Sequence, residues 1–275
     1  MSAVCTGHAQ NGGAKHQFQV YSFIVYAGYT ENGTIVKASH QELQQYLRAY
    51  GFQDLNLIYE QKMLDYPGGD KKNGVPNPER IQALAQTARV YPNTPVSLDL
   101  EGWDRWDTIK TPSRMIEVIN AFKKTNKVSK IGLYATVPPN TYAYSENISR
   151  FDKVNKAYSA VAASVDYFSP SLYNYDTDTV NWNKAAIYNI NACKKYNFPG
   201  KPILPYITPE VNHKGVKRML TYDEMMGHLQ MLYSLGAKGV LLWTSSGMRD
   251  EQGQKIYVDI NTGWAKAVKD FIANH

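Results

Sequence analysis

The sequence is poor in cysteine. Its 275 residues include only Cys5 and Cys193, too few for the disulfide framework of a small secreted domain. The six histidines are scattered, and no Cys/His spacing typical of a metal site is present. We therefore expect neither a metal nor an organic cofactor. A hydrophobic content of 43% is enough to build a core.

Long apolar runs are also missing. No run approaches the ~18 residues of a membrane-spanning helix, so no membrane span is expected. Residues 1–17 are small and polar and lack the apolar segment of a signal peptide, although a removed leader would leave the same appearance. We expect residues 1–17 to be a flexible N-terminal segment, followed by one domain over residues 18–275.

Charge of one sign is not concentrated anywhere. The formal net charge is +6, and the basic residues are spread along the chain. This charge suits an acidic partner such as an anionic polysaccharide. Because no compact basic motif is present, we expect no nucleic-acid partner.

Strand and helix patterns alternate along the chain. The expected strands begin about 35–40 residues apart, which is the size of a βα unit. They cover residues 18–26, 54–60, 96–101, 131–136, 165–175, 202–208 and 239–244. The order predicts the α/β class: a TIM-like (β/α) barrel of about seven parallel strands in a single domain. Functional residues of such barrels lie at the carboxyl ends of the strands.

The third strand carries the most informative pattern. Val96, Leu98 and Leu100 alternate with polar residues, so Asp99 and Glu101 should lie side by side on the opposite face. Two adjacent carboxylates repel each other, and Asp99 should raise the pKa of Glu101. A raised-pKa acid beside a second carboxylate is what sugar hydrolysis requires. The alternative is an edge strand with two solvated acids.

Aromatic residues collect at the same expected rim. Tyr59, Trp103, Tyr134, Tyr167, Tyr173, Tyr206 and Trp243 all lie at or near strand ends. Tyrosine and tryptophan combine an apolar face with a polar donor and often line sugar clefts, although any single tyrosine is more often a core residue. Glu60 follows Tyr59 directly, so we expect its side chain to point away from the carboxylate pair.

Four collinear segments resemble the hyaluronidases of glycoside hydrolase family 56. The segments are Asp99-Leu100-Glu101-Gly102-Trp103; Tyr66-Pro67 with Gly74-Val75-Pro76; Tyr167 with Pro170-Ser171-Leu172-Tyr173-Asn174; and Gly239-Val240-Leu241-Leu242-Trp243. Together they extend over most of the chain. The resemblance implies a barrel of about seven strands and a glycosidase that cleaves after an N-acetylhexosamine.

The resemblance also implies a role for each candidate residue. Glu101 would be the acid and then the base, while Asp99 would orient the 2-acetamido group that attacks its own C1. Tyr167 and Tyr206 would form hydrogen bonds with the acetamido group, and Trp243 would enclose its methyl group. Further substrate contacts are expected from Tyr59, Tyr173 and Trp103.

The sequence departs from the family's pattern in several places. Leu172 stands where animal members commonly have cysteine, and Thr244-Ser245-Ser246 lacks an expected second tryptophan. Cys5 and Cys193 cannot reproduce the animal disulfides. The chain therefore resembles a divergent, disulfide-poor relative.

Several functional alternatives remain open from the sequence. The expected substrate is a glycosaminoglycan such as hyaluronan or chondroitin, cleaved by a secreted or exported monomer. Peptidoglycan and chitin present the same N-acetylglucosamine. A non-catalytic carbohydrate-binding barrel is the alternative of another class, although a binding protein has no need of crowded acids.

Overall fold

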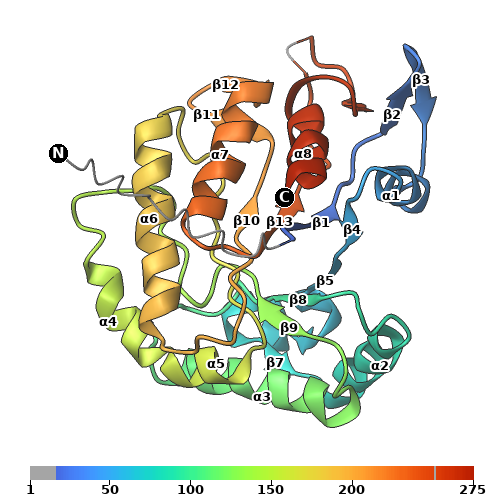
Figure 1. Ribbon diagram of the computed structural model, residues 1–275. Helices are drawn as coiled ribbons and strands as arrows, with labels where there is room; N and C mark the ends of the chain where they lie inside the picture. The colour runs from blue at the N-terminus through green and yellow to red at the C-terminus, as the bar shows by residue number, and fades with distance from the viewer. Residues whose placement is uncertain (1–16, 251) are drawn as a thin grey trace, which may run out of the picture.

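A computed structural model describes residues 17–250 and 252–275. The expected N-terminal segment, except Gln17, and Cys5 lie outside these residues. The chain is α/β, as predicted, with parallel strands at the centre and helices outside them (Figure 1). The central strands are β1 (Gln19–Phe23), β4 (Gln53–Asp54), β5 (Asn56–Tyr59), β8 (Val96–Asp99), β9 (Ile131–Leu133), β10 (Tyr206–Ile207) and β13 (Gly239–Trp243).

The strand pairing follows the order of a barrel. One parallel sheet has the order β10-β13-β1-β4, and a second has the order β5-β8-β9. Only Leu55 separates β4 from β5, so these two short strands occupy one position. Between β9 and β10, residues 166–172 form backbone hydrogen bonds with the chain segments on both sides, at β9 and at β10. The barrel therefore has seven strand positions, as the sequence predicts.

The expected strand at residues 165–175 is not continuous. This segment forms isolated parallel bridges, Phe168 to Ile203 and Ser171 to Tyr206, in place of a regular ladder. Pro170 has no N–H to donate, although its carbonyl accepts from the Tyr206 N–H at 2.8 Å. The chain therefore keeps its place in the barrel but loses regular strand geometry.

Helices surround the strands (Figure 1). They are α1 (His40–Arg48), α2 (Pro78–Arg89), α3 (Lys110–Thr125), α4 (Arg150–Ala157), α5 (Ser159–Ser164), α6 (Thr179–Lys195), α7 (Tyr222–Ser234) and α8 (Gly263–Asn274). The predicted caps Ser39, Asn77 and Thr221 each accept a backbone N–H of the first turn. Within the described residues, no helix is long and apolar enough to cross a membrane.

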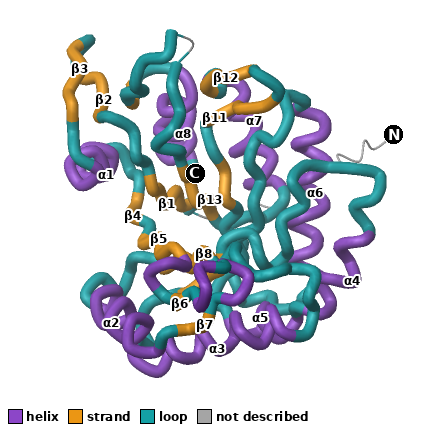
Figure 2. Tube along the Cα trace, turned by 180° about the vertical axis from the view of Figure 1, so that it is seen from behind, coloured by secondary structure: helices purple, strands orange, loops and turns teal. Residues whose placement is uncertain are grey.

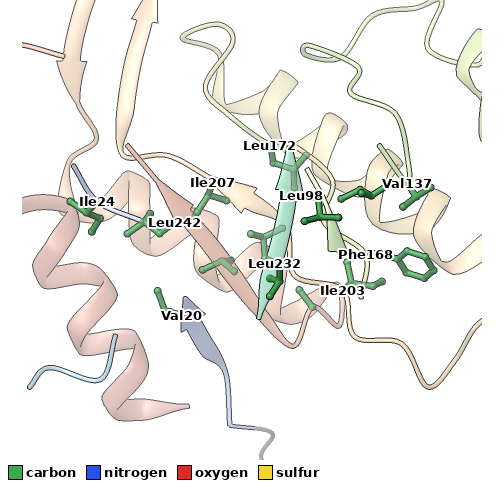
Figure 3. Close-up of a cluster of buried hydrophobic side chains, with 14 of the residues drawn as sticks. Val20, Ile24, Leu98, Val137, Phe168, Leu172, Ile203, Ile207, Leu232 and Leu242 are labelled. Carbon is green, nitrogen blue, oxygen red and sulfur yellow. The ribbon is translucent and has the colours of Figure 1, made fainter. Parts of the chain in front are cut away.

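Side chains alternate between two buried layers. Leu98 of β8 and Leu242 of β13 belong to the larger cluster, which the strands share with helix residues such as Leu232 (Figure 3). The second cluster contains Tyr21, Leu55, Tyr167, Leu204, Tyr206 and Leu241, and it fills the barrel interior. Because neighbours along a strand face opposite sides, β1, β10 and β13 each supply residues to both layers.

Short hairpins outside the barrel were not predicted. They are β2 (Gly28–Glu31) with β3 (Thr34–Lys37), β6 (Leu64–Asp65) with β7 (Val75–Pro76), and β11 (Glu210–His213) with β12 (Val216–Met219) (Figure 2). In addition, β14 (Val258–Asp259) pairs in parallel with β2. Asn32 and Gly33 both have positive φ, as the two central residues of a type I′ turn require. The Asn-Gly dipeptide was therefore a usable signal.

Gly132 of β9 supports a direct test of the barrel interior. A Cβ at this position would lie 2.2 Å from Tyr167 Cε2, because the tyrosine ring packs against the glycine backbone. Gly132→Ala should therefore lower the free energy of unfolding by about 1–3 kcal/mol. Gly227→Ala in α7 meets nothing within 4 Å and should leave stability unchanged or raise it slightly. Urea unfolding of both variants makes the comparison, and equal midpoints for Gly132→Ala and wild type would contradict the packing.

Candidate active site

The predicted alternation along β8 is confirmed. Val96, Leu98 and Leu100 all belong to the buried layer under the helices. Asp99 is the last residue of β8 and pairs with Tyr59 of β5. Glu101 lies just beyond the strand and is exposed to solvent. The two carboxylates are thus at the carboxyl end of β8, where a (β/α) barrel carries its chemistry.

Asp99 is the more strongly perturbed of the two acids. Burial, the Glu101 charge and the Glu60 charge together raise the pKa of Asp99 to about 7, while Lys71 opposes them. Its Oδ1 atom is buried and has no hydrogen-bond partner among the described residues. Asp99 therefore holds a proton far above the pH at which an ordinary aspartic acid loses it.

The pKa of Glu101 is also raised, but by burial and by Glu60 and not by the Asp99 charge that the sequence predicted. Although the residue is exposed, protein atoms around its carboxyl group raise this pKa by desolvation. Arg105 and Lys71 lower the pKa, and Glu60 raises it. The two groups are best treated as one coupled site that retains a proton near neutral pH.

The expectation that Glu60 turns away is wrong. A short 3₁₀ helix, η1 (Glu60–Lys62), begins directly after β5 and takes the backbone out of strand alternation. Glu60 is only 7% exposed, and its Oε2 accepts the Gly102 N–H at 2.6 Å. A third carboxylate therefore lies against the loop that carries Glu101.

Aromatic rings form one wall at the barrel mouth. Tyr173 stacks on Trp243 with ring centroids 5.5 Å apart and an interplanar angle of 19°. The Trp243 indole N–H donates to the Tyr59 hydroxyl at 3.4 Å. These three candidates are thus brought together, and Tyr59 pairs with Asp99 on the neighbouring strand.

Tyr134 is a site residue that received no role from the sequence. It follows β9 directly and lines a cleft together with Glu101 and Arg105. Burial raises the pKa of the Tyr134 phenol, and the charges of Glu101 and Asp99 add to this effect. Its ring centroid lies 5.9 Å from that of Tyr173. The signal in the sequence was its place at the end of the fourth expected strand.

Tyr206 and Tyr167 occupy different depths of the barrel. Tyr206 is fully buried below Tyr134, its hydroxyl has no partner among the described residues, and the Asp99 charge helps to raise its pKa. Tyr167 is 1% exposed and donates to the Val96 carbonyl at 2.8 Å, at the opposite end of β8 from Asp99. Three residues of strand span about 10 Å. The structure therefore argues against a substrate contact for Tyr167, whose hydroxyl is used in the barrel floor.

Trp103 is mostly buried and braces the loop after β8, and it also lines the cleft that contains Glu101 and Tyr134. It is 4% exposed, and its indole N–H donates to the Gly74 carbonyl at 2.9 Å. The Arg114 guanidinium lies 5.8 Å from the ring centroid. Trp103 thus ties the loop after β8 to residues 60–77, with no free donor for a sugar.

Two cations lie near the carboxylates. Lys71 Nζ is 3.9 Å from Glu60 Oε1, and Arg105 donates to the Asn140 carbonyl at 3.2 Å and the Tyr142 hydroxyl at 2.9 Å. Both cations lower the pKa of Glu101. Within residues 17–250 and 252–275, no group of three or more His, Cys, Asp or Glu side chains is arranged to hold a metal ion.

Known structures share this fold at low sequence identity. No protein-family model matches the sequence, and no curated protein matches it significantly. The crystal structure of bee venom hyaluronidase superposes with a TM-score of 0.58 and 16% identity, covering 94% of this chain and 98% of that one.

Two further structures extend the comparison. Bee venom hyaluronidase in complex with a hyaluronic acid tetramer gives a TM-score of 0.53 at 16% identity, covering 83% of this chain and 91% of that one. A chitinase domain from Pyrococcus furiosus, in complex with chito-oligosaccharides, gives 0.50 at 14% identity, covering 94% and 84%. The chain therefore has the (β/α) barrel fold of these glycoside hydrolases.

The raised pKa of Asp99 should appear in the pH dependence of stability. The unfolded chain loses the Asp99 proton near pH 4, whereas the folded protein keeps it to about pH 7. The free energy of unfolding should therefore fall as pH rises between these values, by about 2–4 kcal/mol from this group.

Asp99→Asn should remove this fall. Relative to wild type, the variant should be stabilised more at pH 8 than at pH 4.5, as measured by urea unfolding at both values. Asp223→Asn, at an exposed position, is the matched control. A stability difference between Asp99→Asn and wild type that does not change with pH would show that Asp99 titrates normally.

Proposed function

We propose that this protein is a glycoside hydrolase that cleaves the bond after an N-acetylhexosamine by substrate-assisted retention. The observation that supports this most is the Asp99–Glu101 pair at the carboxyl end of β8, with both pKa values raised. The stacked Tyr173 and Trp243 beside it supply the apolar surface that sugar rings pack against.

In this proposal the two acids have separate roles. Glu101, exposed at the mouth, donates a proton to the leaving oxygen and later takes one from water. Asp99, deeper in the site, accepts the acetamido N–H of the substrate. That hydrogen bond favours the ionised form of Asp99, and a nearby negative charge raises the pKa of Glu101. Substrate binding would thus move the shared proton to the residue that must donate it.

The backbone geometry favours an internal nucleophile. Asp99 and Glu101 are two residues apart, so their Cα atoms are separated by about 6–7 Å, and both belong to one chain segment. A double-displacement glycosidase needs its acid and nucleophile to flank the scissile bond, which neighbours on one segment do poorly. The acetamido oxygen of the substrate solves this problem because the protein then supplies no nucleophile.

The net positive charge of the chain favours an anionic glycan such as hyaluronan or chondroitin, although the site itself carries three carboxylates. Lys71 and Arg105 both lie close enough to affect Glu101, and the net charge of the chain is +6. Chitin and peptidoglycan share the N-acetylglucosamine unit and remain the second candidates. The similarity to a chitinase domain that binds chito-oligosaccharides supports including them in the test.

Glu101→Gln tests the proposed reaction. Loss of one positioned acid should reduce turnover about 10²–10⁴-fold without loss of folding. Wild type and variant are incubated with hyaluronan, chondroitin, chitin and peptidoglycan, and new reducing ends are measured. Glu117→Gln, at an exposed position on α3, is the control. Binding without cleavage of any polymer by wild type would favour the non-catalytic alternative instead.

The acetamido group provides a second test. An N-deacetylated polymer lacks the internal nucleophile, so it should bind but react far more slowly than its parent. A thiazoline analogue of N-acetylglucosamine should inhibit competitively, because it mimics the cyclic intermediate. Initial rates with both polymers and an inhibition series measure these effects. Equal rates on the two polymers would rule out substrate assistance.

A further inference from the structure

Glu60 is a buried charge that the proposed reaction does not use. It lies at the start of η1, directly after Tyr59, with 7% of its surface exposed. Its Oε2 accepts the Gly102 N–H at 2.6 Å, across 42 positions of sequence. Burying a carboxylate is costly unless it is paired and hydrogen-bonded. The hydrogen bond from Gly102 therefore offsets much of the cost of burying Glu60.

The backbone around Gly102 is shaped to admit this carboxylate. A Cβ on Gly102 would lie 3.0 Å from each Glu60 carboxylate oxygen and 3.0 Å from the Lys71 carbonyl oxygen. Gly102 is the residue between Glu101 and Trp103, and the Trp103 indole is itself fixed by Gly74. The loop that carries Glu101 is therefore held from both 60–62 and 71–74.

We propose that Glu60 is a positioning residue of the candidate active site, which anchors the Glu101 loop by accepting the Gly102 N–H. The inference rests on the proposed function only in its consequence for turnover. Glu60 acts through the backbone that follows Glu101 and has no role as proton donor or nucleophile.

Electrostatics gives Glu60 a second effect on the same site. Its negative charge helps to raise the pKa of Asp99 and the pKa of Glu101. Lys71 and Arg105 oppose it at Glu101, and Lys71 alone opposes it at Asp99. The phenol of Tyr66, whose pKa rises to about 12 mainly by burial, also faces Glu60. A brace with no influence on the reaction would leave these titrations unchanged.

Two substitutions separate the hydrogen bond from the charge. Glu60→Gln keeps an oxygen that can accept the Gly102 N–H but removes the charge, whereas Glu60→Ala removes both. Glu79→Gln, at an exposed position on α2, is the control. Each variant is followed by NMR titration of the side-chain carboxyl carbons, by hydrogen exchange of the Gly102 amide, and by the pH dependence of kcat and KM.

We expect Glu60→Gln to shift the titrations of Asp99 and Glu101 to lower pH by on the order of one unit. The alkaline limb of kcat should follow, and the Gly102 amide should remain protected. Glu60→Ala should expose that amide to exchange and lower kcat about tenfold or more beyond Glu60→Gln, with KM changed little, because a small misplacement of a catalytic group is costly.

The inference fails if Glu60→Gln leaves both titrations in place, or if Glu60→Ala leaves Gly102 exchange as in wild type. If Glu60→Ala does not fold, Glu60→Asp takes its place in the exchange measurement, because the shorter side chain keeps the charge but does not reach the Gly102 N–H. The NMR and exchange measurements need no substrate. If wild type cleaves no glycan, the proposed function fails while these two measurements still test Glu60.

Discussion

Burial of carboxylates that are packed together at the mouth of the barrel is the constraint on which the site depends. Asp99 cannot ionise freely because burial and the charges of Glu101 and Glu60 oppose it. The aliphatic residues on the other face of β8 are buried beneath the helices. Their burial stabilises the strand and offsets the cost of holding the carboxylates close together. A strand with one face fixed in the core cannot shift its register to relieve the repulsion, since a one-residue slip would expose that face.

The barrel interior connects the site to the rest of the fold. Tyr167 closes the floor at the start of β8, Tyr206 lies above it, and Tyr134 and Tyr173 reach the mouth. Of these four tyrosines, only Tyr134 and Tyr173 lie where a ligand at the mouth could contact them. Desolvation is the largest cause of both raised pKa values at the mouth of this interior.

The sequence predicted the features that depend on local periodicity. The alternation along β8, the caps at Ser39 and Thr221 and the number of barrel positions are all confirmed. Prediction from the sequence failed where a single residue changes the local backbone geometry. The 3₁₀ turn after Tyr59 rotates Glu60 toward Gly102. Tyr167 was misplaced because strand position alone does not show how deep a long side chain lies, and its hydroxyl reaches down to Val96.

The contact between Glu60 and Gly102 also limits how this chain can change in evolution. Any side chain at position 102 would crowd the carboxylate, while the shorter aspartate at position 60 would leave the Gly102 N–H without its acceptor. Apart from glutamine at position 60, which keeps an acceptor oxygen, neither position can change first without weakening this contact. Descendants of this protein should therefore keep the two residues together or replace them together, although 42 positions separate them in the sequence.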